Sequence, residues 1–226
     1  MGYPGWHIEC SAMSRKYLGD VFDIHSGGVD HIPIHHENEI AQSQALTGKQ
    51  PAKFWLHGEF MMVDGGKMSK KLGNVYTLSQ LEDMGYSPMV FRFFCLNAHY
   101  RKTLNFTFTA LDAAKTAYNR LCENLYEHKI SNEGGDKQKI DGFIKEFDNA
   151  VSDDLNIPKA LGILFTMLKE PKSNDIYQAT LYMDRVLGLN LSAAPENANE
   201  SGSQIPQNVI DLAQERQLAR QQKDFA

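Results

Sequence analysis

The feature that most constrains the fold of this chain is a change in sequence texture near residue 105. Before it, short apolar runs are broken by Gly, Pro and His, and after it, apolar residues recur at three- and four-residue steps. The runs at 21–25 and 54–63 predict extended strands, and residues 37–46 predict a helix that ends at Thr47-Gly48. This alternation of strand and helix predicts an α/β fold for the first half.

Helices dominate the remainder of the chain. Ser87-Pro88 predicts the start of a Phe-rich helix, and the segment from Ser79 to Glu82 predicts a capping box. Later apolar periodicity predicts amphipathic helices, which we place at 111–125, 140–147, 158–168 and 174–187. We therefore expect three regions, namely an α/β part at 1–104, a helical part at 105–190, and a linker with an interrupted polar helix at 191–226.

The composition excludes several classes of protein. With 42% hydrophobic and 23% charged residues, the chain is neither disordered nor collagen-like. Its three cysteines, Cys10, Cys95 and Cys122, are far apart, which favours reduced thiols or a metal ligand over a disulfide framework. We find no run of about 18 apolar residues and no basic-then-apolar leader, so we expect a cytoplasmic location without a membrane span.

A group of potential metal ligands lies in the first 40 residues. His35 and Glu39 are four residues apart at a helix start, so their side chains project from one face. Cys10 from a separate segment could complete most of a tetrahedral shell, and this donor set suits zinc. His36, three residues before Glu39, is a rival ligand, and the alternative is that both histidines merely cap or decorate a polar helix.

A second group consists of the lysines that follow the turn at 64–66. Lys67 and Lys70 stand in a glycine-flanked segment, where they could swing onto a phosphate chain and neutralise the charge that develops during attack on a nucleotide. The alternative is a solvated basic hairpin.

Taken together, these segments resemble the class I aminoacyl-tRNA synthetases and, within them, the cysteinyl-tRNA synthetase family. Six blocks occur in that family's order, and the similarity continues through His99 to Arg101 and 153–158 into the helical half. The blocks are Gly5 to Met13, Phe22 to His25, Gly27 to Asp30, His35 to Gln42, Trp55 to His57 and Lys67 to Lys70.

The resemblance implies a partial Rossmann-like catalytic domain followed by an α-helical bundle that binds tRNA. It also implies a two-step ligase that activates L-cysteine with ATP and Mg²⁺ and then transfers the cysteinyl group to tRNA(Cys). In this family a zinc ion binds the thiolate of the substrate, which serine and alanine cannot imitate.

The resemblance also implies roles for particular residues. The metal positions fall on Cys10, His35 and Glu39. Substrate-binding positions fall on Trp6, His25 and Asp30, where Asp30 would hold the ammonium group. His57, Lys67 and Lys70 would contact ATP, and the two lysines would also be catalytic.

The chain departs from the family pattern at several places. Lys71 stands where the family has serine, and Pro33 lies one residue early, with Ile34 before the paired histidines. The family's His-x-Gly-His signature and its remaining zinc cysteine are not in this sequence. We therefore expect a C-terminal portion that lacks the N-terminal half of the catalytic domain and is inactive alone.

Three alternatives stay open at this point. A mycothiol-pathway ligase would share the zinc site and the lysines but join cysteine to an amino sugar. A stand-alone zinc-binding interaction module would keep the fold without catalysis. A zinc hydrolase would need Glu37 or Glu39 to activate a metal-bound water.

Overall fold

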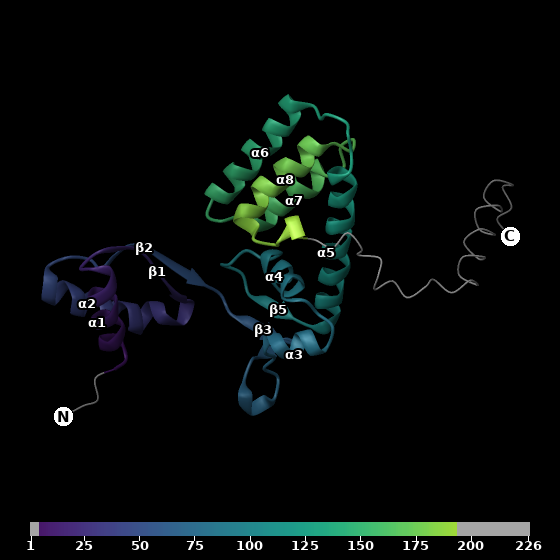
Figure 1. Ribbon diagram of the computed structural model, residues 1–226. Helices are drawn as coiled ribbons and strands as arrows, with labels where there is room; N and C mark the ends of the chain where they lie inside the picture. Colours follow the sequence, from purple (N-terminus) through teal and green to yellow (C-terminus); the bar gives the residue numbers. More distant parts are fainter. Residues whose placement is uncertain (1–4, 194–226) are drawn as a thin grey trace, which may run out of the picture.

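The computed structural model describes residues 5–193 (Figure 1). The linker and final helix that we expected within 191–226 lie outside these residues, apart from a short 3₁₀ turn, η4 (Leu191–Ala193). Within the described range, no helix is both long and apolar enough to cross a bilayer.

The first part of the chain forms a strand–helix–strand unit. Strands β1 (Phe22–Gly28) and β2 (Ala52–Gly58) pair in parallel, with Phe22 opposite Ala52 and Gly28 opposite Gly58. Helix α2 (Glu37–Thr47) makes the crossover between them, as parallel strands require. The helix ends at Gly48, whose φ of 71° is left-handed, so the predicted helix end and the first predicted strand are confirmed.

Helix α1 (His7–Leu18) precedes this unit and was not predicted. Its apolar side chains are spread around the helix and do not gather on one face. No residue of this helix is buried, and Ile8, Met13 and Leu18 are all exposed. The periodic signal that reveals an amphipathic helix is therefore missing from its sequence.

Two irregular turns connect β1 to α2. A 3₁₀ turn, η1 (Val29–His31), is followed by a π turn, η2 (Ile32–His36), that runs directly into α2. π turns are uncommon and concentrate at functional sites. Here the wide turn delivers His35 and His36, both buried, to the end of the strand pair.

The run predicted at 54–63 is two strands that belong to different sheets. Strand β3 (Met61–Val63) pairs antiparallel with β4 (Gly66–Lys67) and parallel with β5 (Leu104–Phe106). The break falls at Glu59, whose N–H donates to the carbonyl of Tyr100 at 2.8 Å. The turn at Asp64 and Gly65, with φ values of 50° and 74°, closes the hairpin as predicted.

The helices that follow agree with prediction except at one cap. Helix α4 (Pro88–Leu96) begins directly after its N-cap residue, Ser87, as expected. The capping box of α3 (Leu78–Asp83) is formed by Thr77 and Gln80, so the prediction of Ser79 and Glu82 was wrong. Thr77 is the last extended residue, whereas Ser79 already lies inside the helix and has no free N-terminal amide to accept from.

The second half is the predicted helical bundle, made of α5 (Phe108–Lys129), α6 (Lys137–Ser152), α7 (Ile157–Met167) and α8 (Asn174–Leu187). One apolar core runs from Val63 to Leu191 and crosses the expected boundary at residue 104. Before Val63, Ala52 is the sole buried hydrophobic residue among those described. The lobe made of α1, β1, α2 and β2 stands beside the bundle (Figure 1).

Candidate functional site

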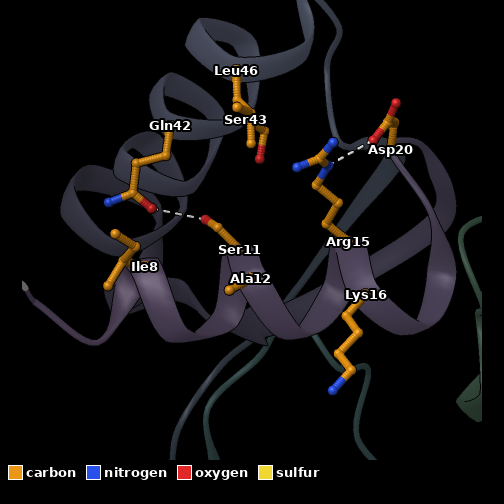
Figure 2. Close-up of a pocket in the computed structure, with 9 residues that line it drawn as sticks. All are labelled: Ile8, Ser11, Ala12, Arg15, Lys16, Asp20, Gln42, Ser43 and Leu46. Atoms are coloured by element: carbon orange, nitrogen blue, oxygen red, sulfur yellow. Dashed lines mark hydrogen bonds and ion pairs between the residues drawn. The ribbon is translucent and has the colours of Figure 1, made fainter.

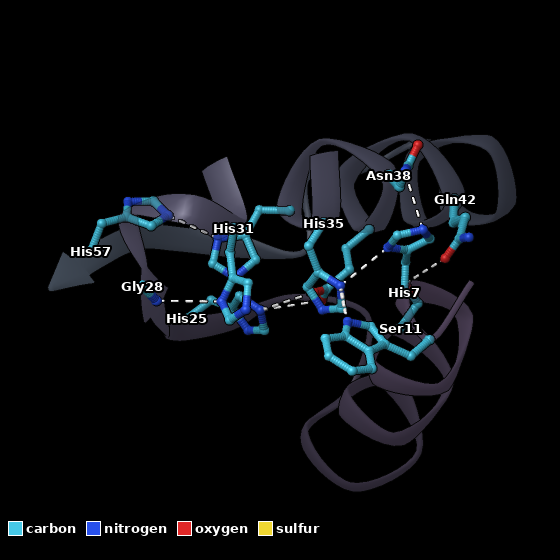
Figure 3. A network of polar contacts seen from close by, with 12 residues as sticks. His7, Ser11, His25, Gly28, His31, His35, Asn38, Gln42 and His57 are labelled. Atoms are coloured by element: carbon cyan, nitrogen blue, oxygen red, sulfur yellow. Dashed lines mark hydrogen bonds and ion pairs between the residues drawn. The ribbon is translucent and has the colours of Figure 1, made fainter. Parts of the chain in front are cut away.

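Polar and aromatic rings gather where the two parallel strands end. β1 supplies His25, β2 supplies His57, and the turns before α2 supply His31, His35 and His36 (Figure 3). Glu39 comes from the first turn of α2, and His7 and Cys10 come from α1. The carboxyl ends of parallel strands are where open α/β sheets place ligands.

A glycine allows the histidines to pack against the strand. A Cβ atom on Gly27 would lie 2.6 Å from Nδ1 of His31 and 2.7 Å from Cε1 of His36, closer than any real contact. The absence of a side chain at this position of β1 therefore makes room for both rings.

Glu39 is the centre of the cluster and is only 3% exposed. Its Oε1 lies 2.8 Å from Nε2 of His35, and its Oε2 lies 3.2 Å from Nε2 of His25. Both carboxylate oxygens thus face imidazole nitrogens, which fixes the orientation of the carboxylate.

Two sets of donor atoms could each hold a metal ion. The donors of Cys10, His35 and Glu39 lie within 4.8 Å of one another, and so do those of His25, His36 and Glu39. Zinc bonds of about 2.0–2.3 Å would draw either set slightly together. The thiol distinguishes the sets, because sulfur, imidazole and carboxylate together are a characteristic zinc environment.

Burial favours the neutral form of three of the rings. Burial lowers the pKa of His36 to about 4, assisted by the neighbouring histidines, and it also lowers the pKa of His35 and of His57. Burial and then the charge of Glu39 raise the pKa of the Cys10 thiol. Neutral imidazoles keep a lone pair for a cation, whereas the thiol needs a nearby positive charge to ionise.

Further rings complete the wall of the cluster. Nδ1 of His36 lies 2.8 Å from Nε2 of His57, and the Trp55 ring packs edge-on against His25 at 4.8 Å between centroids. The indole N–H of Trp6 donates to Nδ1 of His35, while the Trp6 side chain is 62% exposed. Asp30 is exposed on η1.

The predicted lysines lie on a separate hairpin. Lys67 ends β4, and Lys70 opens a short 3₁₀ turn, η3 (Lys70–Leu72); both are exposed. Asn74 holds the loop closed, since its Oδ1 accepts from the Ser69 amide at 2.8 Å and its Nδ2 donates to the Lys67 carbonyl at 3.0 Å. Among the described residues, no hydrogen bond or ion pair joins this loop to the histidine cluster.

Sequence reasoning gave no role to three residues that the structure brings into contact with the predicted ones. His7 and Trp55 belong to the histidine cluster, and Asn74 belongs to the lysine loop. The i, i+3 spacing of His7 and Cys10 would have indicated a shared face, but α1 itself was not predicted. The contacts of Asn74 follow from loop closure, which single-sequence patterns do not reveal.

A groove of about 650 Å³ lies between α1 and α2, away from the rings (Figure 2). Ser11 donates to Gln42 at 2.9 Å across it, and Arg15 pairs with Asp20 at 2.8 Å at its end. The groove is open, and neither Lys67 nor Lys70 nor any of the candidate metal donors lines it.

Comparisons with known proteins give a consistent result. A family model described as the tRNA synthetases class I (C) catalytic domain matches residues 1–116. Cysteine--tRNA ligase 1 of Burkholderia lata is 46% identical and matches 100% of this chain but 46% of its own length. The Cysteine--tRNA ligase of Opitutus terrae is 45% identical, and the match covers 100% of this chain and 47% of that protein. The chain spans about half the length of the curated relatives it matches.

A solved structure shows the same fold. The LeuRS of Agrobacterium radiobacter K84, crystallised as a ternary complex with tRNA and LeuAMS, superimposes with a TM-score of 0.58 at 16% identity. The match covers 78% of this chain and 27% of that chain. At this identity the likeness supports the fold alone, and it agrees with the predicted α/β part followed by helices.

Proposed function

The chain belongs to the family of class I tRNA synthetase (C) catalytic domains, and from this membership we propose that its protein is a cysteine–tRNA ligase. In the first step, a carboxylate oxygen of L-cysteine attacks the α-phosphate of ATP, with Mg²⁺ present, and pyrophosphate leaves. In the second, a hydroxyl of the terminal ribose of tRNA(Cys) attacks the acyl carbon, and AMP leaves. We expect the reaction to take place in the cytoplasm.

The observation that carries the proposal is the convergence of Cys10 from α1, His35 from η2 and Glu39 from α2. These residues would hold a zinc ion, and their donor chemistry fits that metal. Zinc bound there would ligate the thiolate of the substrate, a soft donor that a hydroxyl or methyl group does not replace. Selection of cysteine would then require no second, editing site.

The surrounding residues orient this set. His25 holds one oxygen of Glu39 at 3.2 Å. Trp6 would cover the amino-acid pocket, Asp30 would bind the ammonium group, and His57 would face the nucleotide.

Lys67 and Lys70 would bind the phosphates of ATP and neutralise the charge that develops during adenylate formation. Their exposure and the single hairpin that carries them allow the loop to move toward the strand ends. Lys71, next to them, would add a third positive charge.

The remaining half of the relatives' length would supply the rest of the catalytic domain, so we expect the described residues to be insufficient for activity on their own. Cysteine-dependent exchange of pyrophosphate into ATP tests both points. The complete protein should exchange with cysteine and not with serine, and residues 1–226 alone should not. Exchange by the complete protein that does not depend on cysteine would contradict the proposal.

The alternatives fit less well. A mycothiol-pathway ligase is disfavoured because the named tRNA ligases match the helical half as well as the site. A zinc hydrolase would need a free carboxylate base, whereas both oxygens of Glu39 are engaged and the lysine loop would have no purpose. An interaction module would bind zinc but fail the exchange test.

A further inference from the structure

Two polar contacts join α1 to α2 one helical turn apart. His7 meets Asn38, with Nε2 of the ring 3.3 Å from the amide nitrogen Nδ2, and Ser11 donates to Gln42 at 2.9 Å. The two contacts are equivalent in position, because the second lies four residues after the first on each helix. Only the first pair continues into the histidine cluster, where Nδ1 of His7 lies 3.1 Å from Nδ1 of His35 (Figure 3).

The contacts as they stand define one arrangement of protons. The Asn38 amide donates to Nε2 of His7, so the proton of a neutral His7 ring sits on Nδ1 and points at His35. The indole N–H of Trp6, which can only donate, points at the same atom, so the two N–H groups share the single lone pair of Nδ1 of His35. Nδ1 of His35 therefore accepts, and its proton lies on Nε2, 2.8 Å from Glu39.

A cation held by both His35 and Glu39 requires the ring proton of His35 to lie on the other nitrogen. Nε2 is the nitrogen that faces the carboxylate, so it must offer its lone pair, and the proton must lie on Nδ1. That proton needs an acceptor, and Nδ1 of His7 becomes one when the His7 proton moves to Nε2. Asn38 can accept there, because rotating its amide presents the oxygen in place of the NH₂ group.

From this geometry we propose that His7 and Asn38 are positioning residues that set the tautomer of His35, and hence the affinity of the metal site. The inference rests on the proposed zinc site. Trp6 acts in the opposite sense, because its N–H competes for Nδ1 of His35 and holds the ring in the tautomer that cannot bind through Nε2. Partners of this outer kind change metal affinity by about 10–100-fold when they are altered.

The decisive variant is Asn38→Asp in the complete protein. A carboxylate only accepts, so it fixes the His7 proton on Nε2 and favours the Nδ1–H form of His35. We expect the dissociation constant for Zn²⁺, measured by competition with a chromophoric chelator, to fall about tenfold. His7→Phe removes the relay and should raise that constant about 10–100-fold.

Matched controls come from the neighbouring pair. Gln42→Glu adds the same negative charge one turn further along α2, and Ser11→Ala removes the other α1–α2 hydrogen bond. Neither touches His35, so each should change zinc affinity less than threefold. An equal gain from Gln42→Glu and Asn38→Asp would overturn the relay, because charge alone would then explain the effect.

Ring ¹⁵N chemical shifts of His35 provide a readout that does not depend on activity. In the metal-free protein, Asn38→Asp should move the His35 proton from Nε2 to Nδ1, while Gln42→Glu should leave it in place. An unchanged tautomer in Asn38→Asp overturns the inference. If the complete protein binds zinc and charges tRNA but ignores these variants, only the inference fails; if it binds no zinc, the proposed site fails as well.

Discussion

Arg101 and Asp154 form a two-pronged ion pair across 53 residues of sequence, with Nε 2.6 Å from Oδ2 and Nη2 3.2 Å from Oδ1. Tyr100 donates to the same carboxylate at 2.6 Å, and His99 approaches it at 4.0 Å. The pair joins the turn after α4 to the loop between α6 and α7. That loop holds Asp154 at a φ of 53°, a conformation that needs support from its surroundings.

This ion pair should make stability depend on pH in the acid range. Hydrogen bonds from Arg101 and then Tyr100 lower the pKa of Asp154 below its usual value of 3.8. A carboxyl with a lowered folded-state pKa stabilises the protein above the unfolded value, and that contribution disappears as pH falls through the folded value. The melting-temperature gap between wild type and Asp154→Asn should therefore be largest near neutrality and shrink below about pH 4. A gap that stays constant would contradict this.

His128 should produce a second pH effect in the bundle. The ring is fully buried, accepts from the Ser173 amide through Nδ1 at 3.1 Å and faces the Leu168 carbonyl through Nε2 at 3.2 Å. Burial lowers its pKa from 6.5, so the unfolded chain binds the proton first as pH falls. Stability should be complete above about pH 6.5 and decline below it. Thermal melts of His128→Gln should show a flatter profile between pH 6.5 and 5, with a loss of about 1–3 kcal/mol at pH 7.5.

Gly188 ends α8 at a φ of 61°, and a Cβ there would lie 3.0 Å from Nη2 of Arg92. Gly188→Ala should cost about 1–2 kcal/mol in urea unfolding because of the left-handed backbone. Gly142 in α6 provides the contrast, since no atom lies within 4 Å of its Cβ position. Gly142→Ala should stabilise by about 0.5–1 kcal/mol. Equal effects from the two substitutions would show that backbone conformation is not the cause.

The loop amide Asn74 should influence catalysis more than stability. Asn74→Ala removes both hydrogen bonds that close the Lys67–Lys70 segment, so the lysines lose their fixed spacing. In the complete protein we expect pyrophosphate exchange to fall about tenfold, and about a hundredfold in Lys70→Ala. The melting temperature should change little, because the segment is exposed. Asn105→Ala, which removes the contact to Gly65 at the other end of the hairpin, should have the smaller effect on exchange.

Metal analysis should decide between the two donor sets that share Glu39. If the Cys10 set holds zinc, Cys10→Ser and His35→Ala should lose most of the metal, whereas His36→Asn should retain it. Loss of zinc in His36→Asn, with full retention in Cys10→Ser, would assign the metal to the other set. Emission spectrometry on dialysed complete protein provides the measurement.

The sequence patterns predicted those parts of the fold that depend on local chemistry. Ser87-Pro88 and Thr47-Gly48 mark helix ends because capping involves only neighbouring residues, and the bundle helices follow from apolar periodicity. Helix α1 escaped prediction because it buries nothing. The capping box of α3 was misplaced because Thr77 and Ser79 are chemically similar, and the true start depends on where the extended backbone ends.

The candidate site likewise has a part that local sequence patterns predict and a part that depends on the tertiary structure. The approach of His35 to Glu39 follows from their four-residue spacing, which the continuous run of η2 into α2 preserves. The approach of Cys10 depends on an unpredicted helix, and the room for His31 and His36 depends on Gly27, five residues before a π turn that no local pattern indicates. The roles of Trp6, Asp30 and His57 stay predictions.

The placement of the apolar core has a mechanical consequence. The apolar core begins at Val63, so the lobe made of α1, β1, α2 and β2 lies outside it. This lobe is held by contacts between histidine rings and the Glu39 carboxylate, and such contacts can break and re-form one at a time. Such a lobe opens at lower free energy than the bundle, and its amide protons should exchange sooner. In the proposed ligase, an arriving cysteine would therefore meet a pocket that can adjust, next to a helical half that opens less readily.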